Sequence, residues 1–238
     1  MDWFKTLIIR IMKAMKIFNI VILGLSMVSC TLDNYDMPDS SLSGKFVDVL
    51  TGESLQCDIY NGTVIQYIED GYTEMQTNVV KADGSYCIGQ MFSGSYDVLP
   101  VYTNFEQVDT VKIDVKGATT YDFVVEPYIR IKDVNILKSG LTKVTATFTV
   151  EQVNMDRGVM KVGMFLHKQP IAGAYMCLES RELVIGGQKV GTKQYTIVMD
   201  YKESTTIEEG NTYYIRVGAL SDAVNARFNY APPVSVEL

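Results

Sequence analysis

Residues 212–219 read TYYIRVGA, and every second side chain of this stretch is apolar. Because successive side chains of a β-strand point to opposite sides, the odd-numbered residues from Tyr213 to Ala219 share one face, which we expect to be buried. Tyr214 and Arg216 are then expected to face outward. The same alternation recurs in residues 143–152 and 192–201. This pattern is typical of antiparallel sheets with one face on a hydrophobic core.

From residue 41 onward no window shows sustained helical spacing, and short alternating runs recur between turn residues. The turns at 50–53, 61–62, 82–84 and 116–117 each contain a glycine, as tight reversals with positive φ favour. In the first half, strands are expected at 43–48, 63–69, 73–81, 85–88, 94–100, 110–115 and 120–126. In the second half, they are expected at 128–134, 143–152, 159–167, 174–178, 192–201, 211–220 and 227–236.

Each half therefore supplies the seven strands of a small sandwich. The fold predicted for the chain is all-β, with two consecutive seven-stranded antiparallel β-sandwiches, residues 41–127 and 128–238. The boundary lies near Pro127 without a long linker, so we expect the two sandwiches to abut and to fold independently. Residues 212–219 also resemble the F strand of fibronectin type III and other immunoglobulin-like sandwiches, in which a tyrosine closes the preceding corner.

The N-terminus has the layout of a signal peptide. Four basic residues in the first 16 precede an apolar run at 17–28. This run is shorter than the roughly 20 apolar residues that a membrane-spanning helix needs. Translation starting at Met1, Met12 or Met15 would keep the same layout, so the true start is left open.

Residues 26–30, SMVSC, resemble the lipobox of bacterial lipoproteins, although Met27 stands where leucine is usual. The resemblance implies that residues 1–29 are removed and that Cys30 becomes diacylated and anchors the chain to a membrane. The alternative is an ordinary secretory signal followed by a coincidental cysteine. Residues 30–40 are polar and acidic, like a flexible tether, and resemble the signal that sends Bacteroides-group lipoproteins to the exterior of the outer membrane.

Residues 30–238 contain 17 Lys and Arg against 27 Asp and Glu, a net charge of −10. Such a surface repels polyanions, because nucleic acids and anionic lipid headgroups bind to clusters of basic residues. Nucleic acid is therefore excluded as an expected partner.

Four short motifs recur in order through the first half: LSGKFVD at 42–48, TGE at 51–53, DGSY at 83–86 and FSGSYDV at 92–98. They resemble the carboxypeptidase regulatory-like, or prealbumin-like, sandwich, with Phe46 in place of the usual valine. The resemblance implies that Tyr86 and Tyr96 point inward.

Further stretches bracket this half: DNYD at 33–36, EPYIRI at 126–131 and RFNY at 227–230. With the motifs above they resemble a family of two-domain lipoproteins of the Bacteroides group, domain-of-unknown-function family 3823. This resemblance implies a surface accessory component of a starch-utilisation-type glycan uptake system. It brings no catalytic or binding residues with it.

The residues that catalysis or metal binding requires are few. His167 is the only histidine, which argues against a His-based triad or a multi-His zinc site. It is expected to be a solvated strand-end residue, and the adjacent carboxylates Glu69–Asp70 and Glu208–Glu209 to be turn charges. A calcium site in the acidic segment 33–39 lacks the spacing of an EF-hand. We therefore expect no enzyme activity, cofactor or metal.

The cysteines that follow Cys30 leave one question open. Cys57 and Cys87 share the first half, and an exported protein permits a disulfide between them. Cys87 is expected to face outward, because it lies beside the inward Tyr86. Two separate thiols are the alternative.

Aromatic side chains near the expected loops are the remaining functional signal, since sugar rings stack on such faces. The candidate ligand-binding residues are Tyr102, Phe105, Tyr201 and Tyr230. The function expected is a non-catalytic surface lipoprotein that assists glycan uptake, by binding neutral polysaccharide weakly or by docking to the uptake complex. The alternative is a structural or adhesive sandwich module without a small-molecule ligand.

Overall fold

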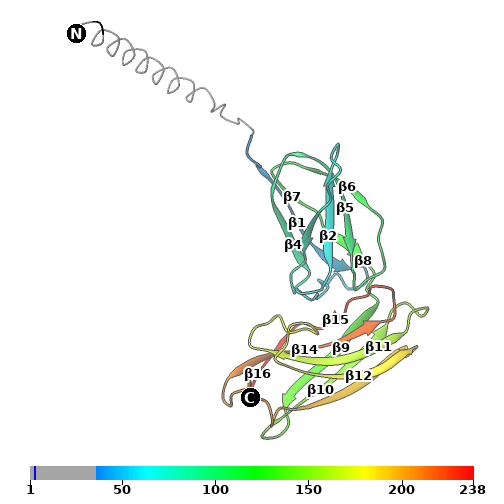
Figure 1. Ribbon diagram of the computed structural model, residues 1–238. Helices are drawn as coiled ribbons and strands as arrows, with labels where there is room; N and C mark the ends of the chain where they lie inside the picture. Colours follow the sequence, from blue (N-terminus) through cyan, green and yellow to red (C-terminus); the bar gives the residue numbers. More distant parts are fainter. Residues whose placement is uncertain (1–2, 4–35) are drawn as a thin grey trace. The chain divides into compact units, whose positions relative to one another are not determined.

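The computed structural model describes Trp3 and residues 36–238, of which Pro38–Leu238 form one compact unit. From residue 36 on, every regular element is a strand (Figure 1). No helix in the described part of the chain is long and apolar enough to cross a membrane. The expected signal peptide, Cys30 and most of the acidic tether lie outside the described residues.

The first sandwich consists of strands β1 to β8. One sheet has β4 (Ser85–Met91), β1 (Ser40–Asp48) and then β7 (Ala118–Thr120), with β8 (Phe123–Val125) also paired to β1. The other has the order β3 (Gln76–Val79), β2 (Val64–Glu69), β5 (Gly94–Val101), β6 (Val111–Val115). Tyr86 and Tyr96 are both buried in the core between these sheets, as expected.

Two details of this sandwich differ from the prediction. It has eight strands, because the stretch expected at 120–126 is divided between β7 and β8. Both of these pair with β1 in parallel, so the sheet is mixed rather than purely antiparallel. Gly44 permits the close approach, since a Cβ there would lie 1.8 Å from the carbonyl oxygen of Tyr121.

The second sandwich packs a three-stranded sheet on a larger one. The first has the order β13 (Thr192–Asp200), β10 (Lys143–Gln152), β9 (Ile129–Lys138). The second has the order β12 (Glu179–Gln188), β11 (Val159–His167), β14 (Thr212–Ser221), β15 (Asn229–Tyr230), and β16 (Val234–Glu237) also pairs with β14. The two-sandwich, all-β prediction is confirmed, again with eight strands in place of seven.

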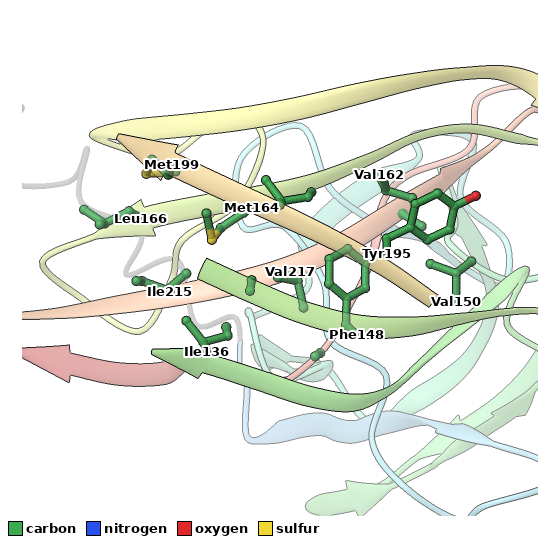
Figure 2. Close-up of a cluster of buried hydrophobic side chains, with 14 of the residues drawn as sticks. Ile136, Phe148, Val150, Val162, Met164, Leu166, Tyr195, Met199, Ile215 and Val217 are labelled. Atoms are coloured by element: carbon green, nitrogen blue, oxygen red, sulfur yellow. The ribbon is translucent and has the colours of Figure 1, made fainter. Parts of the chain in front are cut away.

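The alternating residues quoted above form the core of this sandwich. Phe148 and Val150 of β10, Tyr195 of β13 and Val217 of β14 meet between the sheets (Figure 2). The tyrosine corner is also present. Tyr213 is fully buried at the start of β14, and its hydroxyl accepts a hydrogen bond of 2.8 Å from the backbone N–H of Glu208. This contact holds the loop that enters β14 against the core.

The prediction of a strand at residues 174–178 is wrong. Residues 174–178 form a loop, and the strand of this region is β12. Gly186 and Gly187 lie within this strand. β12 pairs with β11 and β13 pairs with β10, so the glycine-rich stretch carries the chain from one sheet to the other and is no hairpin.

The prediction that Arg216 faces outward is only half right. Its side chain leaves the core of the second sandwich, yet it is fully buried, because the first sandwich covers it. Its Nη1 donates to the carbonyl oxygens of Cys57 (3.2 Å) and Ala172 (3.1 Å), and its Nε donates to that of Ala231 (3.3 Å). Arg216 therefore joins the two sandwiches through buried polar contacts.

Other contacts surround this arginine at the junction. The ring of Tyr230 lies beneath its guanidinium, and the Tyr230 hydroxyl donates to the carboxylate of Asp58 at 2.7 Å. Phe165, Ala172, Phe228 and Tyr230 form a small apolar cluster there. Arg130 of β9 binds Asp48 of β1 through Nε and Nη2. The junction is thus extensive, and independent folding of the two halves stays a prediction.

Candidate functional site

Of the four aromatic candidates, Tyr102 offers a ring to solvent, with 45% of the residue exposed. The other three are buried. Phe105 packs on Phe46 in the first core, at 5.0 Å between ring centroids. The hydroxyl of Tyr201 donates to the carbonyl of Leu141, and Tyr230 belongs to the junction. Only Tyr102 is therefore positioned to stack on a ligand.

Tyr102 lines a cleft of about 470 Å³ whose walls come from both sandwiches. This volume lies within the range of roughly 300 to 1,000 Å³ that is usual for small-molecule sites. The walls combine aromatic, amide and charged groups. The lining residues are Gln66, Val101, Tyr102, Thr103, Glu106, Gln107, Tyr128, Arg157, Ala223, Val224 and Asn225.

Arg227 fixes the position of the exposed tyrosine. Its guanidinium carbon lies 4.9 Å from the centroid of the Tyr102 ring. Nη2 donates to Oδ1 of Asn61 at 3.1 Å, and Nη1 donates to the carbonyl of Asn225 at 3.2 Å. The backbone N–H of Arg227 donates to the carbonyl of Thr103 at 2.9 Å. One arginine thus ties three separate loops together beside the Tyr102 ring.

Backbone strain gathers around the same arginine. Five non-glycine residues in the described part of the chain have positive φ, and three of them contact Arg227: Asn61 (φ 53°), Tyr102 (φ 55°) and Asn225 (φ 59°). Side chains other than glycine pay a steric cost in this region, and such residues cluster at functional sites. The strain therefore marks the cleft independently of its volume.

The charged side of the cleft is also held in place. Glu106 of the first sandwich accepts hydrogen bonds from Arg157 (3.4 Å) and Asn154 (2.7 Å) of the second. The hydrogen bond to Glu106 raises the pKa of Arg157 above its ordinary value. The buried Gln152 donates to the carbonyls of Asn154 and Arg157, which fixes the loop. Carboxylate, guanidinium and amide groups facing one hollow can bind sugar hydroxyls.

The reactive residue types lie elsewhere. Cys57 and Cys87 are both free thiols in the structure, and Cys87 is exposed as expected. Burial raises the pKa of the Cys57 thiol to about 12, so this group is protonated and poorly nucleophilic. Nδ1 of His167 accepts the backbone N–H of Gln169. Among residues 36–238, no three His, Cys, Asp or Glu side chains gather as a metal site.

Two family models match the chain, and together they span both sandwiches. Residues 40–126 match the N-terminal domain of a protein of unknown function, DUF3823, and residues 129–235 match the domain of unknown function DUF3823_C. The chain belongs to the DUF3823 family. The two models meet at residues 127–128, beside the proline at which the sequence suggested a boundary.

Several solved structures share the fold over their whole length. One, titled a "putative carbohydrate binding protein" from Bacteroides uniformis, is 29% identical with a TM-score of 0.74, covering 84% of this chain and 100% of the other. A DUF3823 family protein from Bacteroides ovatus is 25% identical (TM-score 0.67), covering 84% and 100% of the two chains. A third, from Parabacteroides merdae, is 22% identical (TM-score 0.73), covering 85% and 100%, and shows the fold alone. No match was found among the curated proteins.

Sequence reasoning found Tyr102 but missed the residues that build its surroundings. Arg227, Asn225 and Asn61 belong to loops, and nothing in their local sequence shows that they converge. The RFNY stretch was noted only as part of a resemblance. Asn61–Gly62 was predicted as a turn, which agrees with the positive φ of Asn61.

Proposed function

We propose that this chain is a non-catalytic glycan-binding lipoprotein of the outer-membrane exterior, and that the cleft lined by Tyr102 is its binding site. The observation that carries the proposal is the exposed Tyr102 ring, which a stacked arginine and a strained backbone hold at the edge of a polar cleft. The 29% identical structure described as a "putative carbohydrate binding protein" supports the same class of ligand.

The physical chemistry of the cleft favours a weak, neutral ligand. One stacked aromatic ring contributes about 0.5 to 1.5 kcal/mol beyond burial. The net charge of −10 on residues 30–238 disfavours polyanionic glycans. We expect dissociation constants from roughly millimolar to high micromolar, which become effective when many anchored copies act together.

Calorimetry of residues 30–238, the chain without its expected signal peptide, against neutral and acidic polysaccharides tests the binding proposal. Replacing Tyr102 by alanine should weaken binding of a neutral glycan by about 2- to 12-fold, the equivalent of one lost stacking contact. Tyr72→Ala is the matched control, because Tyr72 is also exposed but does not line the cleft. Equal effects of the two substitutions would place the site elsewhere, and hydrolysis of any glycan would overturn the non-catalytic part.

The anchoring proposal rests on the lipobox resemblance and is tested separately. Only a thiol accepts the diacylglyceryl group, so Cys30→Ser should release the protein from the membrane fraction and abolish labelling with a radioactive fatty acid. Cys87→Ser is the control, since Cys87 is an exposed thiol outside the lipobox. A Cys30→Ser variant that stays bound and labelled contradicts the proposal.

A structural or adhesive role is the second candidate, and one feature favours it. β12 ends the order of its sheet, and Val184 on this strand is 78% exposed. A free strand edge with apolar side chains can accept a strand from another protein. This role gains support if the chain binds none of the glycans and Val184→Lys prevents its association with cells that carry the uptake complex.

A further inference from the structure

A second hollow, of about 260 Å³, lies in the second sandwich. Like the first, it carries an exposed tyrosine: Tyr175 is 55% exposed. The residues that line it are Lys161, Ala174, Tyr175, Ser180, Glu182, Leu220, Ala226, Arg227 and Phe228. It therefore repeats the combination of an aromatic ring with polar and charged groups.

Arg227 stands between the two hollows. Its side chain lines the second hollow, while its guanidinium lies against the Tyr102 ring, which lines the first. Two consecutive residues also line different hollows: Asn225 lines the first hollow and Ala226 lines the second. The hollows are therefore neighbours, because Arg227 lines the second and contacts the Tyr102 ring of the first.

The polar groups of the second hollow are fixed by contacts of their own. Lys161 of β11 binds Glu182 of β12 at 3.0 Å, so this pair is neutral overall. The loop that carries Tyr175 is anchored at the junction, because the backbone N–H of Ala174 donates to the Tyr230 hydroxyl at 2.9 Å. Arg227 then leaves one net positive charge on the lining, which otherwise offers hydrogen-bonding groups beside an aromatic ring.

We propose that the two hollows are consecutive subsites for one linear neutral oligosaccharide, which stacks one sugar on Tyr102 and a later sugar on Tyr175 and passes over Arg227 between them. This inference rests on the proposed function of the Tyr102 cleft and adds the form of its ligand. A monosaccharide fills one subsite at a time, whereas a longer chain fills both at once. Affinity should therefore rise with chain length.

The experiment uses residues 30–238, the chain without its expected signal peptide, in calorimetric titrations with malto-, xylo- and manno-oligosaccharides of one to six units. In the series that binds, the dissociation constant should fall by about 2- to 12-fold when the chain becomes long enough to reach the second tyrosine. Tyr175→Ala should remove this gain with chain length. Tyr102→Ala should weaken binding at every length that engages its ring.

The outcomes separate the two proposals. If every length binds with the same affinity, or Tyr175→Ala has the effect of the Tyr72→Ala control, the two-subsite inference is wrong while the Tyr102 site stands. If no saccharide of any length binds, the proposed function itself fails. Thermal unfolding of each variant shows that its fold is intact, since both tyrosines are exposed and their removal should leave the melting temperature nearly unchanged.

Discussion

Two arginine–tyrosine stacks lie at the junction of the sandwiches, and their surroundings are opposite. Arg216 lies 4.3 Å from the Tyr230 ring with both residues buried, while Arg227 lies 4.9 Å from Tyr102, which is exposed. The buried arginine donates to three backbone carbonyls, and burial lowers its pKa. The exposed pair borders both hollows. An arginine–tyrosine stack thus joins the two domains where water is excluded. The same combination of residue types is accessible to a ligand where it is exposed to solvent.

The largest difference between the stacks is expected in the free energy of unfolding. Arg216→Met should lower it by about 3 to 5 kcal/mol, because the carbonyls of Cys57, Ala172 and Ala231 lose their donor and Asp58 loses its nearby cation. Arg227→Met should lower it by about 1 to 2 kcal/mol, because the half-buried Arg227 loses a cation–π contact and its hydrogen bonds to Asn61 and Asn225. Urea denaturation of both variants measures the difference. Similar losses would mean that both stacks are structural.

The buried stack also predicts a pH dependence. Burial raises the pKa of Asp58 from its ordinary value of 3.8 to about 6, against the opposing effects of the Tyr230 hydrogen bond and Arg216. Between these two values the folded state holds the proton more tightly than the unfolded state, so the contribution of Asp58 to stability is present at pH 4 and declines as pH rises through 6. The shift corresponds to about 3 kcal/mol.

Asp58→Asn removes this titration. The free energy of unfolding of the wild type relative to Asp58→Asn should therefore fall between pH 4 and 6, by urea denaturation across that range. Asp48→Asn is the control of opposite sign. Hydrogen bonds to Arg130 and the backbone hold the Asp48 pKa below its ordinary value despite the opposing effect of burial, so its contribution is lost only as pH falls below about 4. A flat difference for Asp58 would contradict the prediction.

Removing the hydroxyl groups of Tyr230 and Tyr102 should give a smaller difference in the free energy of unfolding. The Tyr230 hydroxyl donates to Asp58 and accepts from the N–H of Ala174, so Tyr230→Phe should cost about 1 to 3 kcal/mol of unfolding free energy. Tyr102→Phe should change stability by less than about 0.5 kcal/mol, as expected of a surface substitution. Thermal unfolding of both variants compares them. A larger loss at Tyr102 would reverse the assignment of the two stacks.

The smallest effect concerns the strain beside the exposed stack. Asn225 has φ of 59°, a conformation that glycine adopts without steric cost. Asn225→Gly should therefore change the free energy of unfolding by no more than about 1 kcal/mol, while removing a side chain that lines the cleft. Binding of the neutral glycan should weaken although stability is kept. Unchanged binding would show that the Asn225 amide does not contact the ligand.

The sequence predicted the interiors of the sandwiches better than their junction. β10 and β11 were predicted with their observed bounds. In β10 strict alternation reports one buried face directly, whereas β11 is a mostly apolar run that is buried on both faces. β12 was missed, because an edge strand exposed along much of its length has no such alternation. Arg216 shows the remaining limit. Alternation indicates which side chains leave the core of their own sheet, but not which of those a neighbouring domain then covers.

Of the residues that form the candidate site, the sequence predicted only Tyr102. The reason is again that local patterns do not report long-range contacts. Tyr102 stood out as an aromatic residue near a loop, but so did Phe105, which lies three residues away in the chain and is completely buried. Asn61 and Arg227 meet through a hydrogen bond that spans 166 positions of the chain. Such long-range contacts leave no mark on the local pattern of the sequence.

Gly173 has a consequence for how the family can vary. Its φ is not in the left-handed region, so its backbone conformation does not require glycine. Glycine is required because a Cβ at this position would lie 1.9 Å from Oδ1 of Asp58. Positions 58 and 173 should therefore change together among homologues. Where an aspartate stands at 58, glycine should be retained at 173, and where 58 carries a smaller residue, alanine should become admissible. An alignment of homologues would test this covariation between positions 58 and 173. If the two positions vary together, the two domains have evolved in contact.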